Sequence, residues 1–189
     1  MNKEAILEEL RLDLEEGAFS SFISNFEEAK KIFSKSELAN ELAQLISNNY
    51  TSFKEDAMDY CLGIILKSDY ELGVIDGDKN PFFQLAVMKG SMKLLQCLFE
   101  ESYSVYYKSI DEDQQFDFNA NLSLAAHEIN DEIMSQSQKF YKGLHYNGGF
   151  LDNGKVVLNT EDYGIMNNIT ELYNAIIGRN EIIEYLDTL

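Results

Sequence analysis

Hydrophobic residues recur with the period of an α-helix along most of the chain. The spacing predicts a first helix that ends at Gly17, because glycine suits the left-handed backbone conformation that commonly follows a helix. The apolar positions along one side of this helix are Ala5, Ile6, Leu7, Leu10 and Leu14. An aromatic stripe with helical spacing follows, and we expect it to pack in the core. It consists of Phe19, Phe22, Ile23, Phe26 and Phe33.

Polar residues mark the starts of two further helices. Ser34 and Glu37 form a capping box, in which the serine hydroxyl and the glutamate each accept a hydrogen bond from the other residue's backbone N–H. The segment 51–55 repeats this signal. The apolar faces that follow are Leu38, Leu42, Leu45 and Ile46 in one case, and Met58, Cys61, Leu62 and Ile65 in the other. Residues 1–70 therefore predict four helices, arranged as hairpins because no heptad pattern persists.

One segment has the pattern of strands. Asn153-Gly154 stands between two apolar runs, 150–151 and 156–158, and this dipeptide is typical of a tight β-turn. We interpret residues 145–160 as a small β-hairpin or a long loop inserted between helices.

Two segments share a helix-glycine-helix pattern with paired apolar residues in the second helix. They lie around 81–99, with Gly90 at the expected turn, and around 170–187, with Gly178 in the same position. Each resembles the helical half of an ankyrin repeat, and residues 81–84 resemble the tetrapeptide that begins such a repeat. Two weaker matches, 68–72 and 129–134, lack the glycine. The separation of Gly90 and Gly178 is not a multiple of the 33-residue ankyrin period.

These patterns predict an all-α protein with a single domain over residues 1–189. Residues 1–70 would form N-terminal helical hairpins. Residues 71–189 would form an ankyrin-like, solenoid part with insertions near 100–120 and 145–160. The alternative is an irregular α-helical bundle without repeats.

The charge balance restricts the partners. The chain has 33 acidic side chains against 15 lysines and arginines, a net charge of −18. Nucleic acids and anionic membrane surfaces would be repelled. No segment is apolar for long enough to cross a bilayer, no leader pattern opens the sequence, and Cys61 and Cys97 sit in helical settings typical of buried free thiols. We therefore expect a cytoplasmic protein.

Motifs of catalysis and metal binding are incomplete. His127 has Asp131 four residues later instead of the second histidine of a zinc helix. The segment 76–80 begins like a calcium loop, yet Pro81 replaces its glycine and Val87 its last glutamate, so a turn into a helix is the better interpretation. With no phosphate loop and no nucleophile elbow, we expect neither an enzyme nor a bound metal or cofactor.

The densest acidic stretch runs from Glu100 to Gln138, with nine acidic residues and a single base, Lys108. Its first half also holds three tyrosines, which are enriched in protein interfaces. We take the first half of this acidic stretch as the candidate partner-binding surface. The alternative is that Tyr103 and Tyr107 pack in the core while the acids form a solvated face. The candidate residues are Glu100, Glu101, Tyr103, Tyr106, Tyr107, Asp111, Glu112, Asp113 and Asp117.

Two functions fit these features. The first is a monomeric, non-catalytic module that binds a basic protein, above all an immunity protein that neutralises a basic bacterial toxin such as a nuclease. The second is a general ankyrin-like scaffold or adaptor for another protein partner, whose charge serves solubility. A hydrolase with an unrecognised pair of carboxylates is the weakest alternative.

Overall fold

The computed structural model describes residues 2–49, 55–146, 150–152, 155–157 and 163–189, with side chains described in 2–48, 58–135, 174 and 176–189. Helices dominate this part of the chain, and the prediction of an all-α protein is confirmed. The α-helices are α1 (Lys3–Glu16), α2 (Phe19–Ile32), α3 (Lys35–Asn49), α4 (Glu55–Ser68), α5 (Pro81–Lys89), α6 (Met92–Leu98), α7 (Ser104–Tyr106), α8 (Glu112–Tyr146) and α9 (Tyr163–Leu186). Short helical turns η1 (Tyr70–Gly73), η2 (Gly77–Lys79), η3 (Phe99–Tyr103) and η4 (Tyr107–Ser109) connect them.

The end of the first helix and the start of the third lie where the sequence predicts. Asn2 caps α1 by accepting a hydrogen bond from the N–H of Ala5 at 2.8 Å, and Gly17 ends it with a positive φ of 70°. The Ser34–Glu37 capping box is present at the start of α3, with hydrogen bonds of 3.0 and 3.3 Å between side chains and backbone N–H groups. The equivalent signal at 51–54 lies outside the described residues.

The hairpin of α5 and α6 has the predicted helix-glycine-helix form. Asn80, which is fully buried, accepts hydrogen bonds from the N–H groups of Phe82 and Phe83 and donates to the carbonyls of Leu72 and Ile75. The segment 76–80 is therefore a turn into a helix, as expected. Gly90 turns the chain with a φ of 62°.

The second predicted half-repeat is wrong in its detail, because α9 continues through Gly178 without a turn. Instead of turning the chain, Gly178 allows close packing: a Cβ atom there would lie 1.9 Å from the carbonyl oxygen of Gly90. The two glycines that the sequence aligns as equivalent turns are therefore in contact with each other. The weaker match at 129–134 is likewise helical throughout, inside α8.

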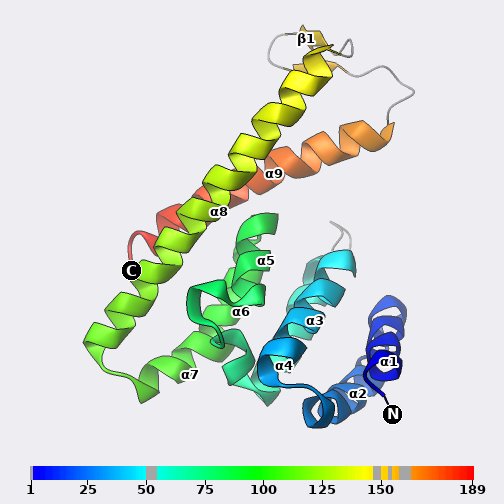
Figure 1. Cartoon of the computed structure of the whole chain (residues 1–189), viewed down its shortest axis with the longest axis vertical. Helices are drawn as coiled ribbons and strands as arrows, with labels where there is room; N and C mark the ends of the chain where they lie inside the picture. Colours follow the sequence, from blue (N-terminus) through cyan, green and yellow to red (C-terminus); the bar gives the residue numbers. More distant parts are fainter. Residues whose placement is uncertain (1, 50–54, 147–149, 153–154, 158–162) are drawn as a thin grey trace.

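The helices form a packed body with a long arm (Figure 1). Helices α1 to α6 make up the body, α8 runs along its side, and α9 returns to cross α8 near the C-terminus. Beyond the body, the far ends of α8 and α9 extend toward strands β1 (Phe150–Asp152) and β2 (Lys155–Val157). These strands pair antiparallel, with Phe150 opposite Val157. The Asn153-Gly154 turn expected between them lies outside the described residues.

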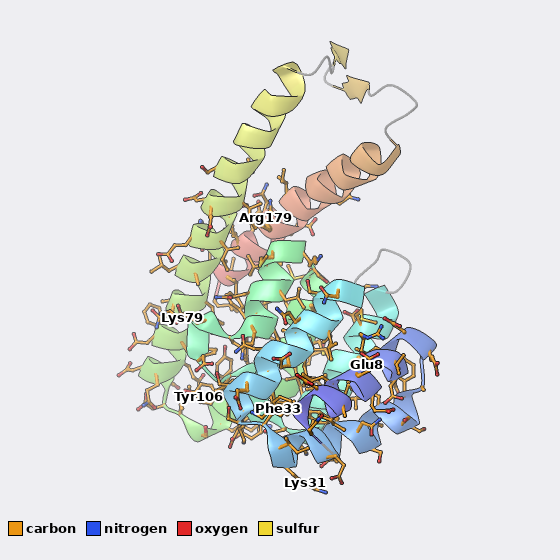
Figure 2. The ribbon with its side chains drawn as sticks, turned by 45° about the vertical axis from the view of Figure 1, so that its right-hand side comes forward. Glu8, Lys31, Phe33, Lys79, Tyr106 and Arg179 are labelled. Atoms are coloured by element: carbon orange, nitrogen blue, oxygen red, sulfur yellow. The ribbon has the colours of Figure 1, made fainter. Side chains whose placement is uncertain are left out.

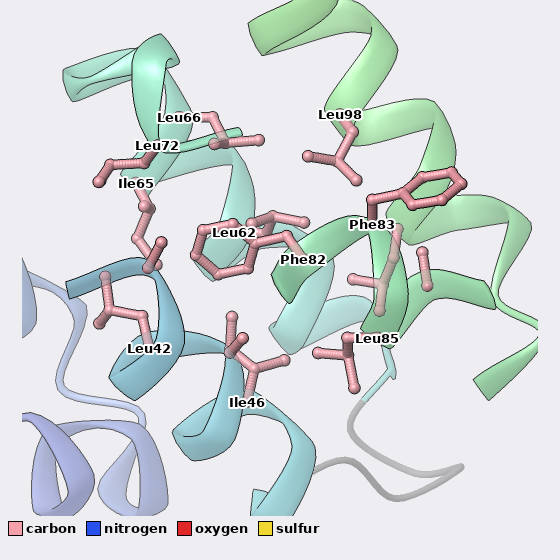
Figure 3. Close-up of a cluster of buried hydrophobic side chains, with 14 of the residues drawn as sticks. Leu42, Ile46, Leu62, Ile65, Leu66, Leu72, Phe82, Phe83, Leu85 and Leu98 are labelled. Carbon is pink, nitrogen blue, oxygen red and sulfur yellow. The ribbon is translucent and has the colours of Figure 1, made fainter. Parts of the chain in front are cut away.

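A continuous cluster of buried side chains links the body with α8 and α9, from Ile6 in α1 to Leu186 in α9. Phe82 lies in the middle of its central part, among side chains of α3 and α4 such as Ile46 and Leu62 (Figure 3). Burying a side chain of this size contributes about 1.5–3 kcal/mol to folding. The apolar faces predicted for α1, α3 and α4 supply much of this core.

A buried arginine joins three helices at the edge of the core. Arg179 of α9 lies near the crossing of α8 and α9 (Figure 2) and is 1% exposed. Its Nε donates to Asn130 Oδ1 of α8 at 2.9 Å, and its Nη1 donates to the carbonyl of Met88 in α5 at 3.3 Å. Burial lowers the pKa of Arg179. These two neutral acceptors hold α9 against α5 and α8.

Within the described ranges, none of the helices is both long and apolar enough to cross a membrane.

Candidate functional site

The three predicted tyrosines lie mainly in the packing contact between α7, with its flanking turns, and α8. Tyr103 is fully buried, with ring centroids 4.8 Å from Phe99 and 5.2 Å from Phe118 in edge-to-face geometry. Burial raises the pKa of Tyr103. A side chain enclosed in this way cannot touch a partner, so its assignment to the binding surface is corrected.

Tyr106 and Tyr107 are half-buried at the edge of this packing contact. Both rings pack on Phe118, with centroids 5.3 and 6.0 Å away. The Tyr107 hydroxyl donates to Asn119 Oδ1, and burial raises the pKa of Tyr107. These two residues can contribute only their outer edges to an interface.

The predicted acids fall in two places instead of one. Glu100 and Glu101 line a groove between α4 and α6, where Glu101 forms an ion pair of 3.2 Å with Lys67. Asp111 lies at the start of α8 and accepts a hydrogen bond of 2.8 Å from the N–H of Gln114, whose side chain accepts one from the N–H of Asp111. Glu112, Asp113 and Asp117 follow on the exposed side of α8.

The outer face of α8 is the larger acidic surface. Residues 111–138 contain seven acidic side chains and neither lysine nor arginine. Among the side chains that the structure describes, Glu112, Asp113, Asp117 and Glu128 are exposed and form no ion pair with a lysine or arginine. Their uncompensated charge would attract a cationic protein and repel an anionic one.

A hollow of about 390 Å³ lies between this face and the end of α9, and the sequence analysis did not identify it. Phe116 and Leu124 stand in its wall with 67% and 60% of their surface exposed. The signal in the sequence was two large apolar residues, two helical turns apart, on an otherwise polar helix face. The lining residues are Phe116, Asn119, Ala120, Ser123, Leu124, His127, Leu186, Asp187 and Leu189.

Asp187 is held in place on one side of the hollow. The Ser123 hydroxyl donates to its carboxylate, and His127 Nε2 lies 3.2 Å from Asp187 Oδ2. These contacts, the serine hydrogen bond above all, lower the pKa of Asp187. The partner of His127 is therefore Asp187, from the end of the chain. Although serine, histidine and aspartate meet here, the hydroxyl is bonded to the carboxylate, whereas a nucleophilic triad needs it bonded to the imidazole.

The groove between α4 and α6 also has a volume of about 390 Å³ but a mixed charge. Lys67 and Lys93 line it together with Asp59, Glu100 and Glu101. Cys97 lies in its wall, and burial raises the pKa of its thiol to about 12. Cys61 is buried with a pKa raised to about 12 for the same reason, so both free thiols stay protonated at neutral pH.

Metal ligands are not gathered in the described part of the chain, where no three His, Cys, Asp or Glu side chains lie in an arrangement suited to an ion. The side chain of His145 lies outside the described residues.

Comparisons of the chain with models of known protein families, with curated proteins and with solved structures gave no match.

Proposed function

We propose that the chain is a non-catalytic protein-binding module that acts as a cytoplasmic monomer and uses its acidic surface to bind a basic protein. Its role in this proposal is that of an immunity protein, which binds and neutralises a basic bacterial toxin such as a nuclease.

The observation that carries this proposal is the uncompensated charge on the outer face of α8. Exposed carboxylates without neighbouring cations raise the association rate with a basic partner, and this effect weakens as salt screens the charges. A nuclease has a basic active site because its substrate is a polyphosphate. An acidic surface is therefore complementary to the part of such a toxin that must be blocked.

The test begins with capture of partners from the native cell's lysate on the tagged chain, at low and at high salt. We expect one basic protein in stoichiometric amount, whose activity is blocked on rebinding. The association rate is then measured for the triple variant Asp111→Asn, Glu112→Gln, Asp113→Asn. Asparagine at position 111 preserves the helix cap, so the change concerns charge alone.

A matched control removes three exposed charges of α1 that form no ion pair, through Glu4→Gln, Glu9→Gln and Glu16→Gln. We expect the α8 variant to slow association about tenfold at low salt, and the control to slow it much less, because steering depends on charges near the interface. Equal rates for the two variants would contradict the proposed binding surface on α8, and with it the proposed function.

The ankyrin-like scaffold is the alternative, and the α5–α6 hairpin with its turn at Gly90 supports it. A scaffold of this kind binds through stacked helical hairpins, and its partners need not be basic. Capture of several unrelated proteins, with little dependence on salt, would favour this alternative.

A further inference from the structure

We propose that the hollow between α8 and the end of α9 receives one large apolar side chain from a lysine- or arginine-rich segment of the partner. This inference rests on the proposed function and adds the point at which the partner is anchored. It concerns the hollow lined by Phe116, Leu124 and Asp187, which we call the α8–α9 hollow.

The apolar wall of the hollow supports an apolar ligand. Phe116, Ala120 and Leu124 are spaced by four residues and so lie along one line of the helix. The small Ala120 leaves a depression between two large side chains that are mostly exposed. Large exposed apolar side chains gathered in one depression, within a polar surface, mark binding sites. Filling such a depression with an aromatic or aliphatic side chain is the usual form of an energetic hot spot.

The surroundings of the hollow select the charge of that ligand. Its lining residues come from 116–127 and 186–189, which contain the acids Asp117 and Asp187 and neither lysine nor arginine. The wider stretches 111–138 and 180–189 together contain ten acidic side chains and neither lysine nor arginine. Asp113 lies one turn before Phe116 on the same side of the helix, and Glu128 lies one turn beyond Leu124. A second copy of this chain would bring like charges together and is therefore disfavoured. A cationic segment would be attracted to the same place.

Asp187 supplies a fixed acceptor beside the apolar wall. Ser123 and His127 hold its carboxylate through contacts from α8. An orienting contact of this kind reduces the conformational entropy lost when a lysine or arginine of the partner binds. The ligand that fits the hollow is therefore a large apolar side chain with cationic neighbours.

The experiment uses the full chain and a display library of short random peptides. We expect the selected peptides to combine a large apolar residue with lysines or arginines on either side. Because the chain contains no tryptophan, a tryptophan placed at the apolar position reports binding by a blue shift of its fluorescence.

The decisive variant is Leu124→Gln, and the matched control is Ile23→Gln, which changes an exposed apolar residue of α2, at 41% exposure. We expect Leu124→Gln to weaken peptide binding about tenfold or more, as hot-spot substitutions do, and the control to leave it unchanged. Both substitutions lie on exposed helix positions, and circular dichroism verifies that both variants fold.

Three results would overturn the inference: no enriched peptide, enriched peptides that lack an apolar residue, or equal binding by the Leu124→Gln and Ile23→Gln variants. The association rate of the captured partner with the variants then shows whether the inference about the hollow fails alone or the proposed function fails as well. If its association is slowed by the α8 charge variant and not by Leu124→Gln, the proposed function stands without the hollow. If neither change has an effect, both proposals fail.

Discussion

The N-terminal helices and the C-terminal part of the chain, which includes most of α8, carry similar surpluses of acid, but the N-terminal helices and α8 arrange their charges differently. Residues 1–60 hold 13 acidic and 6 basic side chains, and residues 121–189 hold 10 and 4. In the first region the bases lie beside acids: Lys3 pairs with Glu37 at 3.0 Å, and Arg11 lies between Glu8 and Glu15. Lys30, Lys31 and Lys35 form further pairs with acids.

Between Asp111 and Gln138 the chain has neither lysine nor arginine, the nearest bases in sequence being Lys108 and Lys139, and Arg179 is buried. Composition alone therefore does not reveal where the negative charge is available to a partner. The ion pairs reveal where that charge is available, because a carboxylate already neutralised by a lysine contributes little to the electrostatic field around the protein. This difference between the two regions predicts different responses to substitution, salt and pH.

The contact between Gly90, which follows α5, and Gly178 of α9 should be the point most sensitive to substitution. Gly178→Ala would place a methyl group 1.9 Å from the Gly90 carbonyl oxygen, and backbone cannot move aside as a flexible side chain can. We expect the free energy of unfolding to fall by about 3 kcal/mol, at the upper end of the usual cost of overpacking. Denaturant titration measures it.

The control for that substitution is Gly63→Ala in α4, where the added methyl group would lie 3.7 Å from the Cys97 sulfur, an ordinary contact. Alanine is the better helix former by about 0.8–1 kcal/mol, so this variant should be as stable as the wild type or more stable. Equal losses in both variants would show that Gly90 and Gly178 are not in contact.

Asn130→Ala should have the next largest effect. It removes the acceptor for Nε of the buried Arg179, at 2.9 Å, and leaves a charged group less well satisfied. Hydrogen bonds to charged groups contribute about 1.5–3 kcal/mol, and we expect a loss in that range by thermal or denaturant unfolding. Asn121→Ala on the exposed side of α8 is the matched control and should change stability little. A similar loss for both would contradict a specific role for the hydrogen bond between Asn130 and Arg179.

The paired region should lose stability in acid through Glu37. Hydrogen bonds from Ser34 and the ion pair with Lys3 lower its pKa from 4.5 to about 2. Because the folded-state pKa is the lower one, the stabilisation is present above pH 4.5 and is lost as the pH falls toward 2. Across this pH window, the free energy of unfolding should depend less steeply on pH for Glu37→Gln than for the wild type. Parallel curves would contradict the structure at this site.

The smallest effect should come from neutralising the unpaired region. Asp117→Asn removes an exposed charge that has no cationic neighbour, so we expect a change in the free energy of unfolding within about 0.5 kcal/mol. The same substitution should lower the salt dependence of partner association. A large loss of stability would indicate that this carboxylate has a structural role, contrary to the comparison above.

The sequence predicted the N-terminal helices well because their ends carry local signals. Gly17 and the Ser34–Glu37 pair each act within one turn of the chain, so their effect does not depend on distant residues. Gly90 belongs to the same class. The sequence also contained the evidence for a long α8, since no glycine or proline occurs between Asp111 and Lys142, but the ankyrin-like interpretation divided this segment.

Gly178 could not be interpreted correctly from its neighbours. A glycine that turns the chain and a glycine that admits another backbone look alike in sequence, and only the packing of α9 on α5 separates them. The α8–α9 hollow escaped prediction for a related reason. Leu186 and Asp187 are brought to the hollow by the folding of the chain, and 60 positions separate Asp187 from His127. Tyr103 was wrongly assigned to the binding surface because tyrosine is common both in protein cores and in interfaces, and the sequence does not distinguish the two.

The Gly90–Gly178 contact also has a geometric consequence for the far end of α9. A helix behaves as a nearly rigid rod, so a point where two backbones touch fixes its rotation about its own axis as well as its distance from the neighbour. Nine residues separate Gly178 from Asp187, a span of about 13.5 Å along the axis. The angular position of α9 set at the glycine pair thereby determines on which side of the molecule Asp187 emerges.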